Sequence, residues 1–199
     1  MKTLIDKSEA RKTVLQRKRG IGSEEISSKT QKIIKRLAAT DDFVYANKIH
    51  IYISNRTGEV DTRKVIDFAL GWGKQIILPK FFKELRTFRR FQFTGWDDLV
   101  KNQDGYLEPK LSVDEDLSDI DLFIVPAVAI SSLGQRVGQG GGHYDRLLRR
   151  AYAPKYVLAF EFQVFDNIET DLHDVRVDKI ITERRTVNTR ENLNFSENS

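Results

Sequence analysis

The sequence predicts a single α/β domain with a largely parallel β-sheet that is flanked by helices on both faces. Short apolar strands alternate with amphipathic helices, and residues 49–79 run strand, helix, strand, which is a βαβ unit. A buried strand at 121–126 leads into a glycine-rich loop and then a helix. We place the domain in residues 1–183 and expect the polar segment 184–199 to be a poorly ordered tail.

The N-terminal part of the chain predicts two helices. The first is basic and spans residues 6–19, with Lys7 and Arg11 on one face because they are four residues apart. Glycines in 20–22 interrupt it, and Ser23 is a suitable N-cap for the second helix. The apolar stripe of the second helix consists of Ile26, Ile33, Ile34 and Leu37.

The βαβ unit is predicted from the alternation of apolar residues and from the residues that begin and end its elements. Residues 49–53 alternate, with isoleucine at every second position, which predicts a strand. Thr62 is expected to cap a helix, and Gly71 is expected to follow its last turn. Residues 75–79 predict a second strand that ends at its proline.

The second half of the chain supplies the remaining elements. We expect a short helical turn at 96–100 and a polar loop at 101–118. The glycine-dense loop 134–142 should lead into a helix whose apolar residues share one stripe. Further strands are predicted at 88–93, 121–126, 156–160 and 178–182.

Composition excludes several classes of protein. The 199 residues contain no cysteine, which rules out disulfide scaffolds, thiolate metal sites and cysteine nucleophiles. No run approaches the ~18 apolar residues that a bilayer helix needs, and residues 1–20 contain no apolar signal segment. We therefore expect a cytoplasmic protein with no membrane partner.

Positive charge is concentrated near the N-terminus. Residues 1–40 hold 11 Lys and Arg against 4 Asp and Glu, although the whole chain carries only +4. A solvated helical face and a site for a polyanion both explain this pattern. Nucleic-acid binding would want aromatic side chains beside the basic ones, and residues 1–40 contain none. We expect no nucleic-acid partner, and a nucleoside triphosphate remains a candidate.

The glycine-rich loop is the strongest chemical signal. Glycine permits positive φ angles and lets backbone N–H groups approach an anion closely, and Arg136 at the mouth of the loop offers a bidentate phosphate contact. Neither a Walker A loop nor a dinucleotide fingerprint is present, and a flexible surface loop is the alternative. Five of the 12 glycines lie in this stretch: Gly134, Gly138, Gly140, Gly141 and Gly142.

The complete string from Gly134 to Asp145, after its proline-ended strand, resembles the 5-formyltetrahydrofolate cyclo-ligase family. That family carries the loop G-x-R-L-G-x-G-x-G-x-Y-D, and this chain has Val137 in place of the leucine. The resemblance covers roughly residues 3–183. Other family motifs occur in the same order, namely Lys7 and Arg11, Ile53 with Glu59 and Thr62, Leu78-Pro79, Glu108-Pro109, Gln163, Asp174, Val177-Asp178 and Thr182-Glu183.

The resemblance implies an ATP- and Mg²⁺-dependent conversion of 5-formyltetrahydrofolate to 5,10-methenyltetrahydrofolate, with release of ADP and phosphate. Phosphorylation of the formyl oxygen creates a leaving group, and N10 then closes the ring without an enzyme nucleophile. The implied partners are these two small molecules, and we expect a monomer. A catalytically weakened relative that only binds folate or nucleotide is the alternative.

The resemblance also assigns roles to residues. Arg136 and Tyr144 are the catalytic candidates, and Ile53, Glu59 and Tyr144 would contact the folate. Asp145 and Asp174 would hold Mg²⁺, which prefers oxygen ligands, although without the resemblance they would be read as ordinary first-turn and loop carboxylates. The ATP-binding set is Lys7, Arg11, Arg136, Val137, Gly138, Gln139, Gly140, Gly141, Gly142, His143 and Tyr144.

Overall fold

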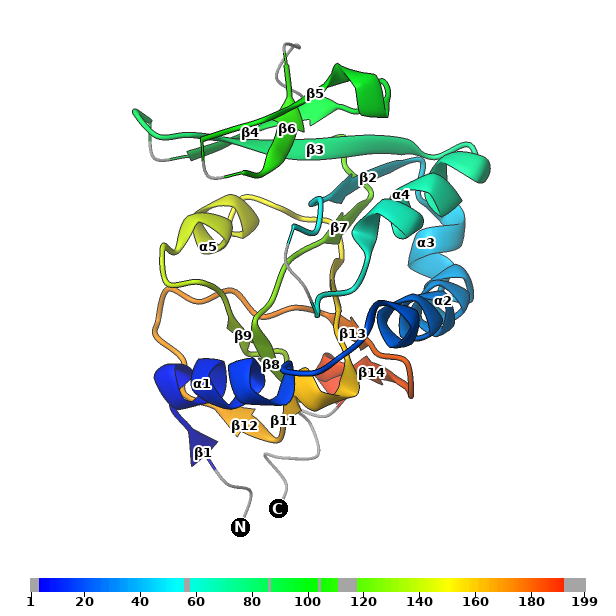
Figure 1. Ribbon diagram of the computed structural model, residues 1–199. Helices are drawn as coiled ribbons and strands as arrows, with labels where there is room; N and C mark the ends of the chain where they lie inside the picture. Colours follow the sequence, from blue (N-terminus) through cyan, green and yellow to red (C-terminus); the bar gives the residue numbers. More distant parts are fainter. Residues whose placement is uncertain (1–3, 56–57, 86, 104, 111–117, 192–199) are drawn as a thin grey trace.

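The computed structural model of the chain describes residues 4–55, 58–85, 87–103, 105–110 and 118–191. A seven-stranded sheet in the order β14–β13–β10–β7–β2–β3–β4 forms its centre, with parallel inner strands and antiparallel edge strands. This confirms the predicted fold class (Figure 1). The strands are β2 (Lys48–Ile51), β3 (Gln75–Phe82), β4 (Thr87–Gln92), β7 (Leu122–Ile124), β10 (Lys155–Leu158), β13 (Lys179–Ile181) and β14 (Thr186–Asn188).

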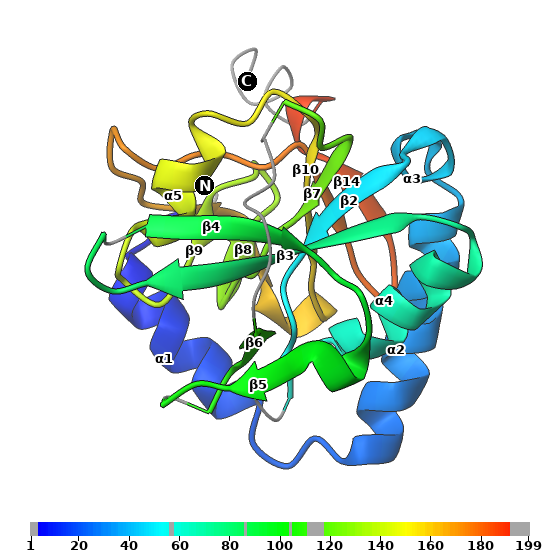
Figure 2. The same ribbon diagram turned by 90° about the horizontal axis from the view of Figure 1, so that it is seen from above.

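Helices cover both faces of the sheet, as Figure 2 shows from above. Alternation along β2 explains the two layers, because Ile49 and Ile51 join the core beneath the helices of one face. His50, between them, lies on the other face with Phe123 and Tyr144. The first face carries α2 (Ser23–Ala38), α3 (Asp41–Tyr45) and α4 (Thr62–Gly71), and the second carries α5 (His143–Leu148).

Helix ends differ from the prediction by one or two residues. Helix α2 begins at Ser23 itself, with Gly22 as its N-cap. The side chain of Asp61, one residue before the predicted cap, accepts the hydrogen bond that caps α4. Gly71 is still helical, and Gly73 instead takes the positive φ angle after the helix. Gly73, two residues after Gly71, can end the helix equally well, because a residue in the left-handed conformation is what this end requires.

The prediction that β3 ends at Pro79 is wrong, because the strand continues to Phe82. Pairing with β2 ends at Ile77, opposite His50, and Pro79 pairs only with Arg90 of β4. A proline lacks a backbone N–H and is tolerated where a strand has a neighbour on one side only. The extended β3–β4 hairpin therefore projects beyond the sheet and contacts α5.

The tail expected from residue 184 is also partly a strand. β14 pairs antiparallel with β13, and Val187 is buried in the core. The sequence analysis did not predict this strand, because it is short and polar and only one of its side chains faces inward. Residues 192–199 of the expected tail, and residues 111–117 of the expected polar loop, lie outside the described residues.

Smaller sheets place α1 (Lys7–Arg17) beside the glycine loop. Ala10 and Val14 of α1 pack with Ala129, Val137 and Ile168, so the helix lies against β8 and β9. No helix among the described ranges combines the length and apolar character needed to cross a bilayer. The small elements are β1 (Leu4–Ile5), β5 (Leu99–Lys101), β6 (Leu107–Pro109), β8 (Ala129–Ser131), β9 (Arg136–Val137), β11 (Val164–Phe165), β12 (Asn167–Ile168), and the 3₁₀ turns Trp96–Asp98 and Glu161–Gln163.

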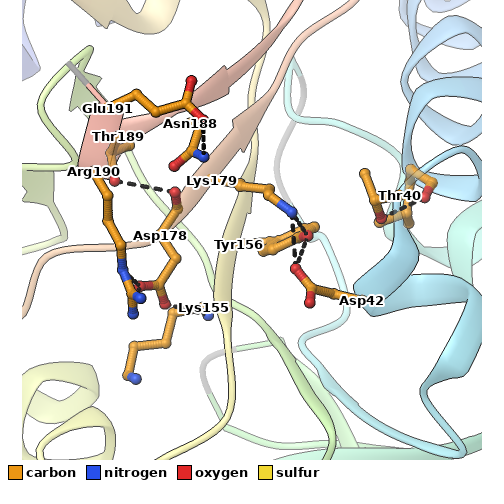
Figure 3. Close-up of polar contacts among 11 residues, drawn as sticks. Thr40, Asp42, Lys155, Tyr156, Asp178, Lys179, Asn188, Thr189, Arg190 and Glu191 are labelled. Carbon is orange, nitrogen blue, oxygen red and sulfur yellow. Dashed lines mark hydrogen bonds and ion pairs between the residues drawn. The ribbon is translucent and has the colours of Figure 1, made fainter.

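A polar cluster fastens α3 to the amino ends of β10 and β13 (Figure 3). The Tyr156 hydroxyl donates to Asp42, and Lys179 Nζ donates to Asp42 Oδ2 at 2.9 Å and to Tyr156 Oη at 2.8 Å. Burial alone would raise the pKa of Asp42, but the hydrogen bonds from Tyr156 and Lys179 hold it below its usual value. Burial and Asp42 together raise the pKa of Tyr156 to about 12.

Replacing Asp42 with asparagine is expected to lower the free energy of unfolding at pH 7 by about 1 kcal/mol, since the pair is partly exposed and screened. A carboxyl whose pKa is lowered by folding stabilises the protein above its unfolded pKa of ~3.9, and this contribution disappears as the pH falls through the folded pKa. Urea unfolding at pH 7, and again in acid well below the unfolded pKa of ~3.9, measures the difference. Asp41→Asn, at the exposed neighbouring position, is the control. An equal loss at both pH values would contradict the prediction.

Candidate functional site

The glycine loop leads into α5, as the sequence predicts (Figure 1). Two short strands that the sequence did not predict, β8 and β9, lie between β7 and Gly138, and β9 occupies positions 136–137 of the predicted loop 134–142. Gly140 and Gly142 have φ angles of 104° and 61°, which residues with a side chain rarely adopt. A Cβ atom on Gly138 would lie 3.0 Å from Arg136 Nη1. The loop therefore follows a path that requires glycine and lies directly against an arginine.

Arg136 lies beneath the loop rather than at its mouth, which corrects the sequence-based expectation. The residue is only 4% exposed, because β9 points it inward. Its Nη2 donates to Asp145 Oδ1 at 2.8 Å, its Nη1 donates to the Pro126 carbonyl at 3.2 Å, and its Cζ lies 5.8 Å from the centre of the Tyr144 ring. Arg136 thus joins the floor of the loop to the first turn of α5.

Helix α1 contributes two cations to the same region, on one face as their spacing predicts. Arg11 Nε donates to the Gly138 carbonyl at 2.8 Å. Lys7 Nζ lies 2.7 Å from Asp171 Oδ2 and also pairs with Asp174. Burial alone would lower the pKa of Lys7, but these two carboxylates raise it, so its ammonium group stays charged.

The two predicted metal ligands lie on adjoining segments. Asp145 Oδ1 accepts a hydrogen bond from the backbone N–H of Val175, at 3.3 Å, and Val175 directly follows Asp174. Each carboxylate is paired with a cation of the chain, Asp145 with Arg136 and Asp174 with Lys7. This convergence of segments 29 positions apart was visible in sequence only through the family resemblance.

The residues fit Mg²⁺ in ligand type. Mg²⁺ takes oxygen ligands and is usually held by one or two carboxylates together with substrate phosphates and water. Among the described residues, no group of three or more His, Cys, Asp and Glu side chains forms a metal cage. Asp145 and Asp174 therefore suit a cation that arrives with a nucleotide.

An aromatic cluster borders the loop on the other side. The rings of His143 and Phe81 of β3 contact each other in a tilted arrangement with 4.2 Å between their centres, and the ring centre of Tyr144 lies 4.9 Å from that of Phe88 of β4. Sequence reasoning found His143 and Tyr144 but missed the two phenylalanines. Phe81 lies beyond the expected end of its strand at Pro79, and the predicted strand 88–93 was not placed beside the glycine loop. Aromatic residues in a strand that projects past its neighbours are the signal that would have found them.

Ile53 and Glu59, the remaining folate candidates, lie in the segment after β2. Glu59 Oε1 is 3.7 Å from Lys18 Nζ, just beyond the C-terminus of α1. Because a helix rises about 1.5 Å per residue, Lys18 lies about 16 Å along the axis of α1 from Lys7. Gly58 has a positive φ and a Cβ there would lie 2.4 Å from Lys18, so this turn is closely fitted to α1.

A cavity of about 610 Å³ opens beside Lys7 and Arg11. Asn167, Ile168 and Glu169, which follow one another in the chain, also line it. This volume is within the range of sites for small organic ligands. The carboxylates of Asp6, Glu169 and Asp171 line the cavity together with these two cations, so its walls carry charges of both signs beside apolar side chains.

Comparison with known proteins decides the family. The sequence profile of the 5-formyltetrahydrofolate cyclo-ligase family matches residues 4–183. The chain belongs to this family. The "5-formyltetrahydrofolate cyclo-ligase" of Escherichia coli K12 is 29% identical over 175 residues, covering 85% of this chain and 96% of the relative. The "Probable 5-formyltetrahydrofolate cyclo-ligase" of Caenorhabditis elegans is 28% identical over 181 residues, covering 84% and 87%.

Solved structures of the cyclo-ligase family agree with the fold. The Aquifex aeolicus 5,10-methenyltetrahydrofolate synthetase superimposes with a TM-score of 0.81 and 32% identity, covering 92% of this chain and 93% of that one. The Mycoplasma pneumoniae synthetase, at 24% identity and a TM-score of 0.70, covers 89% of this chain and 98% of that one and supports the fold. The cyclo-ligase profile ends at residue 183, just before β14.

Proposed function

We propose that the chain is an ATP-dependent 5-formyltetrahydrofolate cyclo-ligase. One observation carries this proposal beyond family membership, namely the convergence of Lys7, Arg11 and Arg136 on the glycine loop and its flanking carboxylates. Three cations beside a loop of closely approachable N–H groups suit the triphosphate of a nucleotide. The names of the E. coli and A. aeolicus relatives support the conversion of 5-formyltetrahydrofolate to methenyltetrahydrofolate as the reaction.

The proposed reaction moves the γ-phosphoryl group from ATP to the formyl oxygen. The terminal P–O bond of ATP breaks, a P–O bond to the formyl oxygen forms, and ADP leaves. The N10 lone pair then attacks the formyl carbon, phosphate departs with the former formyl oxygen, and N10 loses its proton. No covalent bond to the protein forms, so the absence of cysteine from the sequence is no obstacle.

The chain's own residues would position the substrates and stabilise charge. Lys7 and Arg11 suit the outer phosphates, and Arg136, held rigidly beneath the loop, suits the charge on the phosphoryl group in transfer. Asp145 and Asp174 would hold Mg²⁺, which neutralises phosphate charge when bound with the nucleotide. We assign the folate to Tyr144, Ile53 and Glu59, as the family resemblance implies.

Turnover of the purified protein tests the proposal directly. The protein is incubated with MgATP and 5-formyltetrahydrofolate, and the methenyl product is followed by its near-ultraviolet absorbance. We expect one ADP and one phosphate per methenyl product. Turnover without ATP would contradict the mechanism. A folded protein that binds folate or nucleotide without turnover would favour the weakened relative over an enzyme.

We also infer a cytoplasmic monomer without nucleic-acid or membrane partners. The absence of aromatic side chains from the basic residues 1–40 supports the exclusion of nucleic acid. Size-exclusion chromatography with light scattering should give a mass near 23.0 kDa. A dimer mass at micromolar concentration would overturn the monomer.

Replacing Asp174 with asparagine should raise the Mg²⁺ concentration for half-maximal activity at least about tenfold, because one negatively charged ligand is lost. Asp171→Asn is the matched control, since Asp171 also pairs with Lys7 but is not assigned to the metal. We expect the control to keep the wild-type Mg²⁺ titration. Circular dichroism should show both variants folded. Identical titrations for Asp174→Asn and the wild type would remove Asp174 from the metal site.

A further inference from the structure

His50 occupies an unusual place for a histidine. It lies in the middle of β2 and is 0% exposed, between two isoleucines that face the opposite layer. Its ring lies 5.2 Å from the ring of Phe123, and it meets Tyr144 edge-on with 6.2 Å between ring centres. The imidazole therefore lies beneath the first turn of α5, directly after the glycine loop.

Polar atoms around this contact lack partners. Neither ring nitrogen of His50 has a hydrogen-bond partner on another described residue, and the same holds for the buried hydroxyl of Tyr144. Buried polar groups are nearly always hydrogen-bonded, because leaving them unpaired costs stability. A phenylalanine would fill the space beside Phe123 and Tyr144 without that cost. The structure thus keeps two unpaired polar groups on neighbouring rings, and one of these rings, Tyr144, is a residue that we assign to the folate site.

The two groups are chemically complementary. Burial lowers the pKa of His50 to about 3, and the charge of Arg90 acts in the same direction, so the imidazole is neutral and keeps one acceptor nitrogen. The Tyr144 hydroxyl is a phenol, which carries its proton at neutral pH and can donate one hydrogen bond. One ring therefore offers an acceptor and its neighbour offers a donor.

We propose that His50 is a positioning residue that accepts a hydrogen bond from Tyr144 when folate occupies the site. Paired in this way, β2 would fix the ring of Tyr144 against which the folate packs. A strand at the centre of the sheet is a rigid support for such a contact. This inference rests on the proposed function, because it assigns Tyr144 to the folate.

The test compares two substitutions at position 50. His50→Phe keeps a flat ring against Phe123 but removes both nitrogens, and His50→Gln keeps an acceptor and a donor in a different shape. We expect His50→Phe to raise KM for 5-formyltetrahydrofolate about tenfold, with kcat and KM for ATP within about twofold of the wild type. Its melting temperature should be equal or higher. His50→Gln should keep the lower folate KM of the two variants although it is less stable.

A double-mutant cycle with Tyr144→Phe isolates the hydrogen bond from other effects of either side chain. If the pair acts together, the double variant should have the folate KM of Tyr144→Phe alone. If the two substitutions instead raise the folate KM independently, so that their fold-changes multiply in the double variant, the proposal is overturned. A wild-type folate KM for His50→Phe would also overturn it. A folate KM that follows melting temperature in all variants would show a structural role only and also overturn it.

Failure of the proposed function gives a different result. A folded wild-type protein that neither converts nor binds 5-formyltetrahydrofolate in calorimetric titration would overturn both proposals. A wild-type protein that turns over normally, with a His50→Phe variant indistinguishable from it, would overturn only the role of His50.

Discussion

Replacing Arg136 with alanine is expected to lower kcat/KM for ATP by a factor of about 30 to 1,000, equivalent to roughly 2–4 kcal/mol of transition-state stabilisation. The guanidinium lies beneath the glycine loop, held by Asp145 and the Pro126 carbonyl. A donor fixed in this way stabilises developing charge without reorganising during the reaction. Initial rates over a range of ATP concentrations, at saturating 5-formyltetrahydrofolate, measure the effect.

The same substitution should also destabilise the fold, contrary to what a loop arginine would suggest. Arg136 is buried and pairs with a carboxylate that is itself only 15% exposed, so its removal leaves Asp145 without its cation. We expect a loss of about 3 kcal/mol in the free energy of unfolding. Arg136→Lys is the control, since it keeps the charge but loses the forked contact. Its kcat/KM for ATP and its free energy of unfolding should both lie between those of the wild type and those of Arg136→Ala. A folded Arg136→Ala variant with wild-type kcat/KM would remove Arg136 from the catalytic site.

Gly134→Ala is expected to lower the free energy of unfolding by about 3 kcal/mol or more. Gly134 has a φ of 83°, and a Cβ there would lie 2.5 Å from the carbonyl oxygen of Val177 and 3.1 Å from Thr189. The backbone carbonyl cannot move easily, because Gly134 and Val177 are also joined by a hydrogen bond of 3.0 Å. Chemical denaturation at pH 7 gives the loss.

Gly73→Ala is the matched control for this prediction. Gly73 has a φ of 73°, and nothing lies within 4 Å of a Cβ placed there. It should lose only about 1 kcal/mol, which is the cost of the left-handed conformation for alanine. Equal losses in the two variants would show that the contact with Val177 adds nothing.

The sheet was predictable from sequence because its signals are local. The alternation around His50 and the apolar run of β7 each report one strand, and a strand, loop and helix in succession force a parallel crossover. The ends of elements were less predictable, because they depend on neighbours. Pro79 looks like a strand terminator until β4 is known to pair on one side only.

The residues of the candidate site also differ in whether a local pattern of the sequence could place them. Lys7 and Arg11 could be placed together, since four residues span one turn of a helix. The burial of Arg136 could not be predicted, because it depends on α1 and the segment around Val175 closing over β9. The pairing of Glu59 with Lys18 likewise joins segments whose distance no local pattern encodes.

Strand β14 has a practical consequence for work with this protein. Thr189, just after the strand, donates to the Val177 carbonyl at 2.5 Å, and its side chain closes one side of the space around Gly134. A shortened expression version designed on the family boundary at residue 183 would remove this lining from the turn that leads into Arg136. Fusion partners and affinity tags therefore belong beyond residue 191, where they leave the strand and its contact with the turn intact.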